Sequence, residues 1–238
     1  MKKYKIEVCH SPALYPFYEN REAVVVVTDI LRASSAIVSA FMNGVDKIIP
    51  VGTLEEAKAY KDKGYMVAAE RDGIVRDFAD FGNSPYNFTP ERVKGKHIVY
   101  STTNGTNAIN LASSGSLVLI GAYLNISALA SHIKKAERDL LILCAGWKNK
   151  FNLEDTLFAG ALSQMVLEDN QFHSICDATL GAIDLYNVAR KDMMTYVEKV
   201  AQKGRLKANN LDDVIPYCHE HDLTDLIPVL DGDYLATL

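Results

Sequence analysis

Charged side chains follow two apolar segments of this sequence, directly after each segment ends. Asp29 and Arg32 come after four consecutive valines, and Glu70 and Arg71 come after the segment that ends at Ala69. A carboxylate in such a position can bind a hard divalent ion or act as a general base, and an arginine can hold a phosphate. These residue types therefore predict chemistry on an anionic substrate.

A third apolar segment is followed by a turn rich in hydroxyl and amide groups. Its residues are Thr102, Thr103, Asn104, Gly105 and Thr106. Backbone N–H groups and hydroxyls at the start of a helix suit a phosphate or sulfonate oxyanion. One hydroxyl would be enough for an N-cap, so the three threonines favour anion binding over capping alone.

Two carboxylates follow a fourth apolar segment, and they have a strong structural alternative. Glu154 and Asp155 come just after Asn152, a typical N-cap, so they would also complement the dipole of the first helical turn. Asp29 has the same ambiguity, since aspartate is a preferred N-cap for the helix that follows it. Glu70 could equally belong to a surface cluster of ion pairs.

Cys144 requires a separate test as a nucleophile. It precedes Lys150 with five residues between them, which is similar to the C-x5-R loop of cysteine phosphatases. A lysine cannot supply the planar, two-pronged contact that arginine makes with a phosphate. We therefore favour carboxylate chemistry over a cysteine nucleophile.

The elements that must position these residues alternate between strands and helices. Helical patterns at residues 32–43, 104–111 and 127–136 lie between apolar segments, and Thr53 and Glu56 form a predicted capping box that opens a further helix. Several of the segments are apolar throughout, which is typical of strands buried on both faces. The predicted strands are Lys5–Cys9, Ala23–Thr28, Lys47–Val51, Tyr65–Ala69, His97–Ser101, Leu117–Gly121 and Leu140–Cys144.

This alternation predicts an α/β fold, a three-layer α/β/α arrangement with a largely parallel sheet. The last third is richer in helical patterns (155–169 and 176–203), with one strand signal at 226–230. We predict a single domain over residues 1–238, with possible subdomains 1–150 and 151–238. Since ligands of open α/β sheets bind beyond the carboxyl ends of the strands, the polar residues above should meet there.

Composition restricts the classes of function. The chain of 238 residues is 48% hydrophobic and 23% charged, with a net charge of −5, which is typical of a globular protein and argues against nucleic-acid and membrane partners. Four scattered cysteines and the lack of an apolar segment in residues 1–7 lead us to expect a reduced, cytoplasmic protein without a signal peptide. The glycine-rich dinucleotide, P-loop, zincin and α/β-hydrolase signatures are absent.

An ordered set of short segments resembles the 2-phosphosulfolactate phosphatase family. The segments are Val27–Ser35, Glu70–Arg71, Gly82–Pro85, Ser101–Thr106, Cys144–Gly146, Leu153–Asp155, Ala159–Gly160 and Gly204–Arg205 with Asp213. Each is weak alone, but together they span nearly the whole chain in the family's order. The sequence departs from the family at Asp72, where a glycine is usual, and this adds a negative charge beside an anionic substrate.

The resemblance implies a Mg²⁺-dependent phosphatase that converts 2-phospho-3-sulfolactate to 3-sulfolactate and phosphate, a step toward coenzyme M. It implies a catalytic set of Asp29, Arg32, Glu70 and Asp155, and a metal set of Asp29, Glu70, Glu154 and Asp155. The implied substrate-binding residues are Arg71, Asn83, Ser84, Thr102, Thr103, Asn104, Gly105 and Arg205.

The partner expected from this resemblance is a small anionic phosphorylated substrate, and a homo-oligomer is possible. Asp29 is the expected base or nucleophile, and Mg²⁺ would polarise the phosphoryl oxygens and stabilise the leaving alkoxide. A different class of protein could use the same threonine turn and arginines. It would be a non-catalytic module that binds a phosphorylated metabolite and needs no metal.

Overall fold

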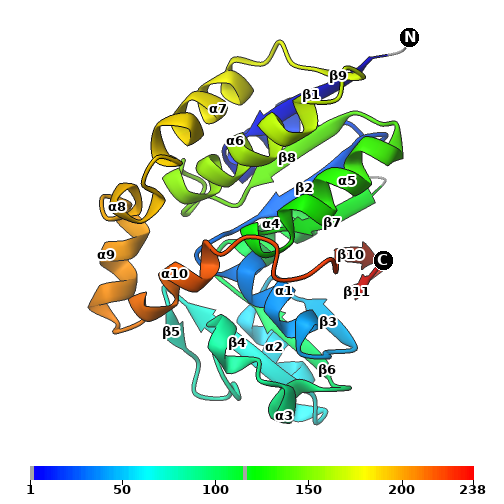
Figure 1. The fold of residues 1–238 in the computed structure, drawn as a ribbon. Helices are drawn as coiled ribbons and strands as arrows, with labels where there is room; N and C mark the ends of the chain where they lie inside the picture. Colours follow the sequence, from blue (N-terminus) through cyan, green and yellow to red (C-terminus); the bar gives the residue numbers. More distant parts are fainter. Residues whose placement is uncertain (1–2, 115–116) are drawn as a thin grey trace.

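The fold is seen in a computed structural model that describes residues 3–114 and 117–238 (Figure 1). Residues 1 and 2 of the segment 1–7, for which we expected no signal peptide, lie outside the described residues. Its strands are β1 (Tyr4–Cys9), β2 (Val24–Thr28), β3 (Lys47–Pro50), β4 (Met66–Arg71), β5 (Ile74–Val75), β6 (His97–Ser101), β7 (Leu117–Gly121), β8 (Leu140–Cys144), β9 (Phe172–His173), β10 (Pro228–Asp231) and β11 (Tyr234–Thr237). Its α-helices are α1 (Ala33–Met42), α2 (Leu54–Asp62), α3 (Pro90–Val93), α4 (Gly105–Ala112), α5 (Ile126–Ala136), α6 (Leu153–Leu167), α7 (Asp177–Ala189), α8 (Met193–Val197), α9 (Ala201–Ala208) and α10 (Ile215–Cys218). Short 3-10 turns are η1 (Pro12–Phe17), η2 (Pro85–Asn87), η3 (Tyr123–Asn125) and η4 (Asp212–Val214).

One mixed, mostly parallel sheet organises the chain. The strand order is β5-β4-β6-β3-β11-β10-β7-β2-β8-β1-β9. Strands β1, β2, β3, β4, β6, β7, β8 and β9 make parallel pairs, whereas β5 and the β10–β11 hairpin are antiparallel. The predicted α/β class and largely parallel sheet are confirmed, and all seven predicted strands are present within two residues of their bounds.

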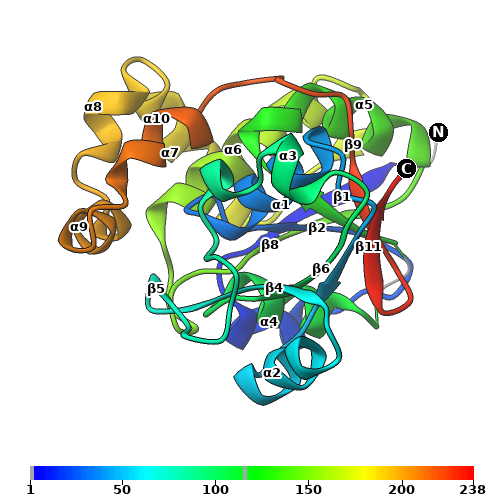
Figure 2. The same cartoon turned by 90° about the horizontal axis from the view of Figure 1, so that it is seen from below.

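Strand β2 shows why the predicted segments are apolar throughout. Val24 and Val26 contribute to one apolar cluster, with helices α5 and α6, while Val25 and Val27 contribute to another cluster, with α1 and α4. Both faces of the strand are therefore buried, and an alternating pattern would leave polar groups in one of the two cores. In Figure 2, α2 and α4 lie on one side of the sheet, and α5 and α6 lie on the other.

The last third differs from its prediction in two ways. The predicted helix over 176–203 is broken into α7, α8 and α9, with breaks at residues 190–192 and 198–200. The strand signal at 226–230 corresponds to β10, but its partner β11 was not predicted. The hairpin joins the middle of the sheet through one bridge on each side, from Val229 of β10 to Leu119 of β7 and from Leu235 of β11 to Ile48 of β3. Helices α8 and α9 lie near β5, away from both termini (Figure 1).

Within residues 3–114 and 117–238, no helix has the length and apolar character needed to cross a membrane.

Candidate functional site

A small cavity lies where the predicted strand ends meet, and its volume is about 20 Å³. Its lining residues come from the end of β4, from the segments that follow β2, β4, β5, β6 and β8, and from helix α9. They are Asp29, Leu31, Arg32, Glu70, Gly73, Asn83, Thr103, Asn104, Trp147, Gln202 and Leu206. The predicted meeting of strand-end polar residues at one edge of the sheet is confirmed for five of them, Asp29, Arg32, Glu70, Thr103 and Asn104, while their chemical roles stay predictions.

Asp29 both supports helix α1 and faces the cavity. Its Oδ1 accepts a hydrogen bond from the N–H of Ala33 at 3.3 Å, and its own N–H donates to Ser34 Oγ at 3.0 Å. The structural and functional interpretations of Asp29 are therefore compatible, because the carboxylate lines the cavity while one oxygen holds the first helical turn.

Arg32 is a buried cation with an unused donor. The residue is only 3% exposed, and its Nη2 donates to Asn83 Oδ1 at 2.7 Å. Its Nη1 is buried and has no hydrogen-bond partner among the described residues. A buried guanidinium nitrogen left without an acceptor is costly, so the cavity is suited to an anion that would accept from it. Asn83, carried by the long irregular segment before α3, fixes the other side of the guanidinium.

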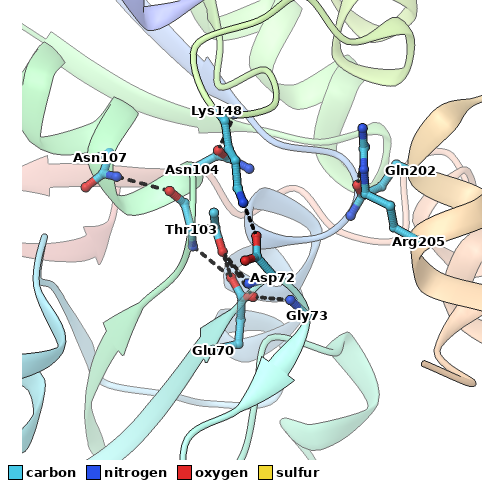
Figure 3. A network of polar contacts seen from close by, with 9 residues as sticks. All are labelled: Glu70, Asp72, Gly73, Thr103, Asn104, Asn107, Lys148, Gln202 and Arg205. Atoms are coloured by element: carbon cyan, nitrogen blue, oxygen red, sulfur yellow. Dashed lines mark hydrogen bonds and ion pairs between the residues drawn. The ribbon is translucent and has the colours of Figure 1, made fainter. Parts of the chain in front are cut away.

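Glu70 is held by two backbone N–H groups and by one hydroxyl group. Its Oε2 accepts from the N–H of Gly73 at 2.6 Å, and its Oε1 accepts from the N–H and Oγ1 of Thr103 at 2.8 and 3.1 Å (Figure 3). These bonds tie the end of β4 to the turn after β6. The carboxylate thus organises the cavity wall, and the Thr103 donors that we expected to bind an anion are engaged by Glu70.

Asp155 is the most deeply buried carboxylate of the site, with 0% exposure. Its Oδ1 accepts from the N–H of Ile30 at 2.8 Å, and its Oδ2 accepts from the N–H of Gly146 at 3.1 Å and from Asn152 Nδ2 at 2.8 Å. It therefore connects the segments that follow β2 and β8. Asn152 precedes helix α6 as predicted, but its side chain donates to Asp155 and makes no N-cap bond.

The three carboxylates Asp29, Glu154 and Asp155 destabilise one another's charged forms. Burial and the nearby charge of Asp155 raise the pKa of Asp29 well above its usual range. Burial raises the pKa of Glu154 to about 7, and burial together with Glu154 raises the pKa of Asp155 to about 8. This is the electrostatic character expected of a site that is completed by a cation or that works through a proton.

Several predicted substrate-binding residues do not line the cavity. Thr102 and Thr106 exchange hydrogen bonds at the start of α4, with Thr102 Oγ1 accepting from the N–H of Thr106 at 3.2 Å. Arg71 donates to the carbonyl oxygens of Glu70 and Gly52 and to Ser101 Oγ, so it fastens neighbouring strands together. Ser84, Gly105 and the predicted catalytic residue Asp155 are also outside the lining set, whereas Glu154 and Arg205 line an adjoining pocket.

The adjoining pocket has a volume of about 230 Å³ and shares two residues with the cavity, Trp147 and Gln202. Neither was singled out from the sequence, and neither was Leu206. The only available signal for Trp147 was its place directly after Gly146, beyond the end of β8. Gln202 and Leu206 belong to a helix far along the chain, and one sequence offers no pattern that brings it to this edge.

Cys144 is unsuited to act as a nucleophile. It is 0% exposed, and burial raises the pKa of its thiol well above the usual value. A thiolate is the attacking species of cysteine phosphatases, and both burial and the nearby Asp155 disfavour it here. In the described part of the chain, no three His, Cys, Asp or Glu side chains are grouped as a metal-binding cluster.

Comparison with known proteins identifies the family. The profile of the 2-phosphosulpholactate phosphatase family matches residues 9–233. The chain belongs to this family. Proteins named probable 2-phosphosulfolactate phosphatase are 34% identical in Caldanaerobacter subterraneus subsp. tengcongensis (91% of each chain covered), 36% in Clostridium novyi (87% of this chain, 89% of the relative) and 34% in Thermotoga maritima (89% and 90%). The resemblance inferred from the short segments is thereby confirmed.

The family match contains every residue that lines the cavity, from Asp29 to Leu206. The departure at Asp72 has a local explanation in the structure. Asp72 has a φ of 54°, a conformation that favours glycine, and its carboxylate Oδ1 pairs with Lys148 Nζ at 2.8 Å (Figure 3). The lysine offsets the added negative charge, and the pair links the β4–β5 turn to the segment after β8.

Proposed function

We propose that this protein is a phosphoric monoester hydrolase that converts 2-phospho-3-sulfolactate to 3-sulfolactate and phosphate with the help of Mg²⁺. The observation that carries the proposal is the unpartnered Nη1 of Arg32, buried beside carboxylates with raised pKa values. A phosphoryl group would accept from Arg32, and the carboxylates would handle the proton or the cation that hydrolysis needs. The names of the relatives support the same substrate.

In the reaction that we propose, Arg32 binds the phosphoryl oxygens and Asn83 keeps its guanidinium plane fixed. Asp29, which lines the cavity with Arg32, accepts the proton of the attacking water in its charged form, and its raised pKa makes that form a stronger proton acceptor. Water bonds to phosphorus and the bond from phosphorus to the ester oxygen breaks. The leaving alkoxide takes a proton from solvent to become 3-sulfolactate, and Asp29 returns its proton to solvent. Glu70 acts by holding the wall that contains Thr103.

The predicted carboxylates are not grouped as a metal-binding cluster in the described part of the chain, so they would have to come together around the ion, but their donor type suits Mg²⁺. Asp29, Glu154 and Asp155 offer hard carboxylate oxygens, and their charged forms are unfavourable as long as no cation balances them. The ion, when bound, would supply a positive charge for the phosphoryl oxygens and the leaving oxygen. Glu70 would complete this set only by giving up some of its bonds to the backbone.

The proposal also includes the cellular compartment, the use of the product and the entry of the substrate. The four cysteines are free, which supports a reducing compartment, and we place the enzyme in the cytoplasm. The product, 3-sulfolactate, would serve the synthesis of coenzyme M. A cavity of about 20 Å³ holds little more than one water, so its walls must move apart to admit the substrate.

Phosphate release tests the proposal directly. The purified protein is incubated with racemic 2-phospho-3-sulfolactate and with a panel of other phosphomonoesters, each with Mg²⁺ and with EDTA. We expect Mg²⁺-dependent release that is fastest on the sulfonate. A preference for another ester would reject the substrate, release in EDTA would reject the metal, and no release by the folded protein would favour the non-catalytic binding module.

A further inference from the structure

Helix α9 forms one wall of the cavity through two residues on the same face. Gln202 and Leu206 are four positions apart, so their side chains lie one above the other along the helix, and both line the cavity. Gln202 is only 8% exposed and is the polar member of the pair. A buried amide in the wall of an anion site is a candidate hydrogen-bond donor.

Arg205 lies behind Gln202 and not in the cavity. Its Nη1 donates to Gln202 Oε1 at 2.9 Å (Figure 3). Its guanidinium carbon lies 4.1 Å from the centroid of the Trp147 ring. The guanidinium is thus stacked on an aromatic face on one side and bonded to the amide on the other. Arg205 therefore fixes the orientation of Gln202.

The identity of the two atoms follows from the chemistry of arginine. A guanidinium carries donors only, so the amide atom that faces Arg205 must be the oxygen. The other amide atom, Gln202 Nε2, is then the donor, and it donates to no described residue. Gln202 Nε2 therefore joins Arg32 Nη1 and the amide nitrogens of Asn83 and Asn104 as donors of the cavity lining that have no partner among the described residues.

We propose that Gln202 binds the phosphoryl group of the substrate through Nε2, and that Arg205 is a positioning residue which acts through Gln202 and is itself held by Trp147. The inference rests on the proposed function, because it assigns a donor for the same phosphoryl group. It also changes the expected role of Arg205 from direct substrate binding to orientation of the amide.

Binding of inorganic phosphate tests the inference without turnover. Trp147 is the only tryptophan of the chain, so its fluorescence reports binding at this wall, and calorimetry gives an independent Kd. Gln202→Glu keeps an oxygen for Arg205 but replaces the donor by an acceptor, and Gln202→Met removes the amide without adding charge. We expect both variants to raise the Kd for phosphate by about 10-fold or more, with a larger effect on KM than on kcat.

The role of Arg205 is tested by its coupling to Gln202. Arg205→Met should raise the Kd for phosphate by roughly 3- to 10-fold, and Arg205→Lys should recover most of the affinity because the ammonium still reaches Oε1. In the Gln202→Met background, Arg205→Met should have no further effect, since the amide that it orients is gone. Lys207→Gln, which removes a positive charge from an exposed position of the same helix, should leave the Kd unchanged.

Circular dichroism and unfolding midpoints confirm that each variant is folded before its Kd is compared. Wild-type affinity in both Gln202 variants would overturn the inference, and an additive loss in the double variant would overturn the positioning role of Arg205. Failure of the proposed function has a different signature, because the wild-type protein would then hydrolyse no phosphomonoester, whatever the Kd values of the variants for phosphate.

Discussion

The carboxylate of Asp29 lies against the α-carbon of Gly105. A β-carbon added at Gly105 would be 2.9 Å from Asp29 Oδ2 and 2.5 Å from the β-carbon of Ala33. Both distances are shorter than real contacts of this kind, so the starts of helices α1 and α4 can approach this closely only with glycine at position 105. Gly105 thus serves the site by packing, whereas the sequence suggested anion binding.

Gly105→Ala should therefore lower both activity and stability. The extra methyl must displace Asp29 or the start of α1, and such overpacking costs about 1–3 kcal/mol of unfolding free energy. Urea unfolding and phosphate-release kinetics measure the two effects. Gly181→Ala is the matched control, because a β-carbon there meets nothing within 4 Å, and it should leave turnover unchanged. Equal activity in the two variants would contradict this prediction.

Asp29→Asn should remove turnover without unfolding the protein. The amide cannot take a proton from water, and loss of a general base typically slows the reaction by about 10²–10⁴-fold. Stability at pH 8 should be retained or increased, because burial and Asp155 already disfavour the charged carboxylate. The amide oxygen can still accept from the N–H of Ala33. Turnover close to that of the wild type would remove Asp29 from the proposed role.

The sequence predicted the sheet well because its strands are buried on both faces. Val24–Val27 have no polar alternation, and that pattern is specific to strands covered on two sides. The hairpin of β10 and β11 was missed in part because its contacts are non-local. Val229 bridges to Leu119 and Leu235 bridges to Ile48, and no local pattern indicates pairs so distant along the chain.

The site was predictable only where residues directly follow predicted strands. Asp29, Glu70 and Thr103 meet because parallel strands end at one edge. The sequence could not separate residues that face the cavity from residues that fasten its walls. Arg71 and Thr102 are of the expected types, but hydrogen bonds within the protein occupy them, and such pairings depend on side-chain directions that spacing does not encode.

Arg32→Lys should weaken substrate binding strongly. The ammonium cannot both replace Nη2 at Asn83 Oδ1 and present a second donor in the plane that Nη1 occupies. Loss of one charged hydrogen bond is worth about 1.5–3 kcal/mol, so kcat/KM should fall roughly 10- to 100-fold. Steady-state kinetics measure this change, and Arg21→Lys, at an exposed arginine, is the control. A kcat/KM unchanged by Arg32→Lys would show that Nη1 does not meet the phosphoryl group.

Cys144→Ala should preserve turnover. The thiol is buried, and its raised pKa keeps it protonated, so it supplies no nucleophile. We expect kcat/KM within about 2-fold of the wild type and a loss of stability on the order of 1 kcal/mol from the small cavity. Iodoacetamide should not inactivate the folded enzyme. Loss of turnover in a variant that unfolds at the normal midpoint would restore the cysteine-nucleophile hypothesis.

The metal-free protein should become less stable as pH rises from about 4 to 8. Below the unfolded pKa values, both states hold the protons of Glu154 and Asp155. Above them the unfolded chain releases its protons first, because burial raises the folded pKa of Glu154 to about 7 and, together with Glu154, that of Asp155 to about 8. The folded state then binds more protons than the unfolded state, so the free energy of unfolding falls with pH.

The same argument fixes how Mg²⁺ should act on stability. An ion held by these carboxylates favours their charged forms, so it should stabilise the protein more at pH 8 than at pH 5. Urea unfolding at the two pH values, in EDTA and in MgCl₂, measures both effects. Glu154→Gln keeps an oxygen to accept from Asn152 but cannot ionise, so it should flatten the dependence on pH. Equal stabilisation by Mg²⁺ at both pH values would show that the ion binds elsewhere.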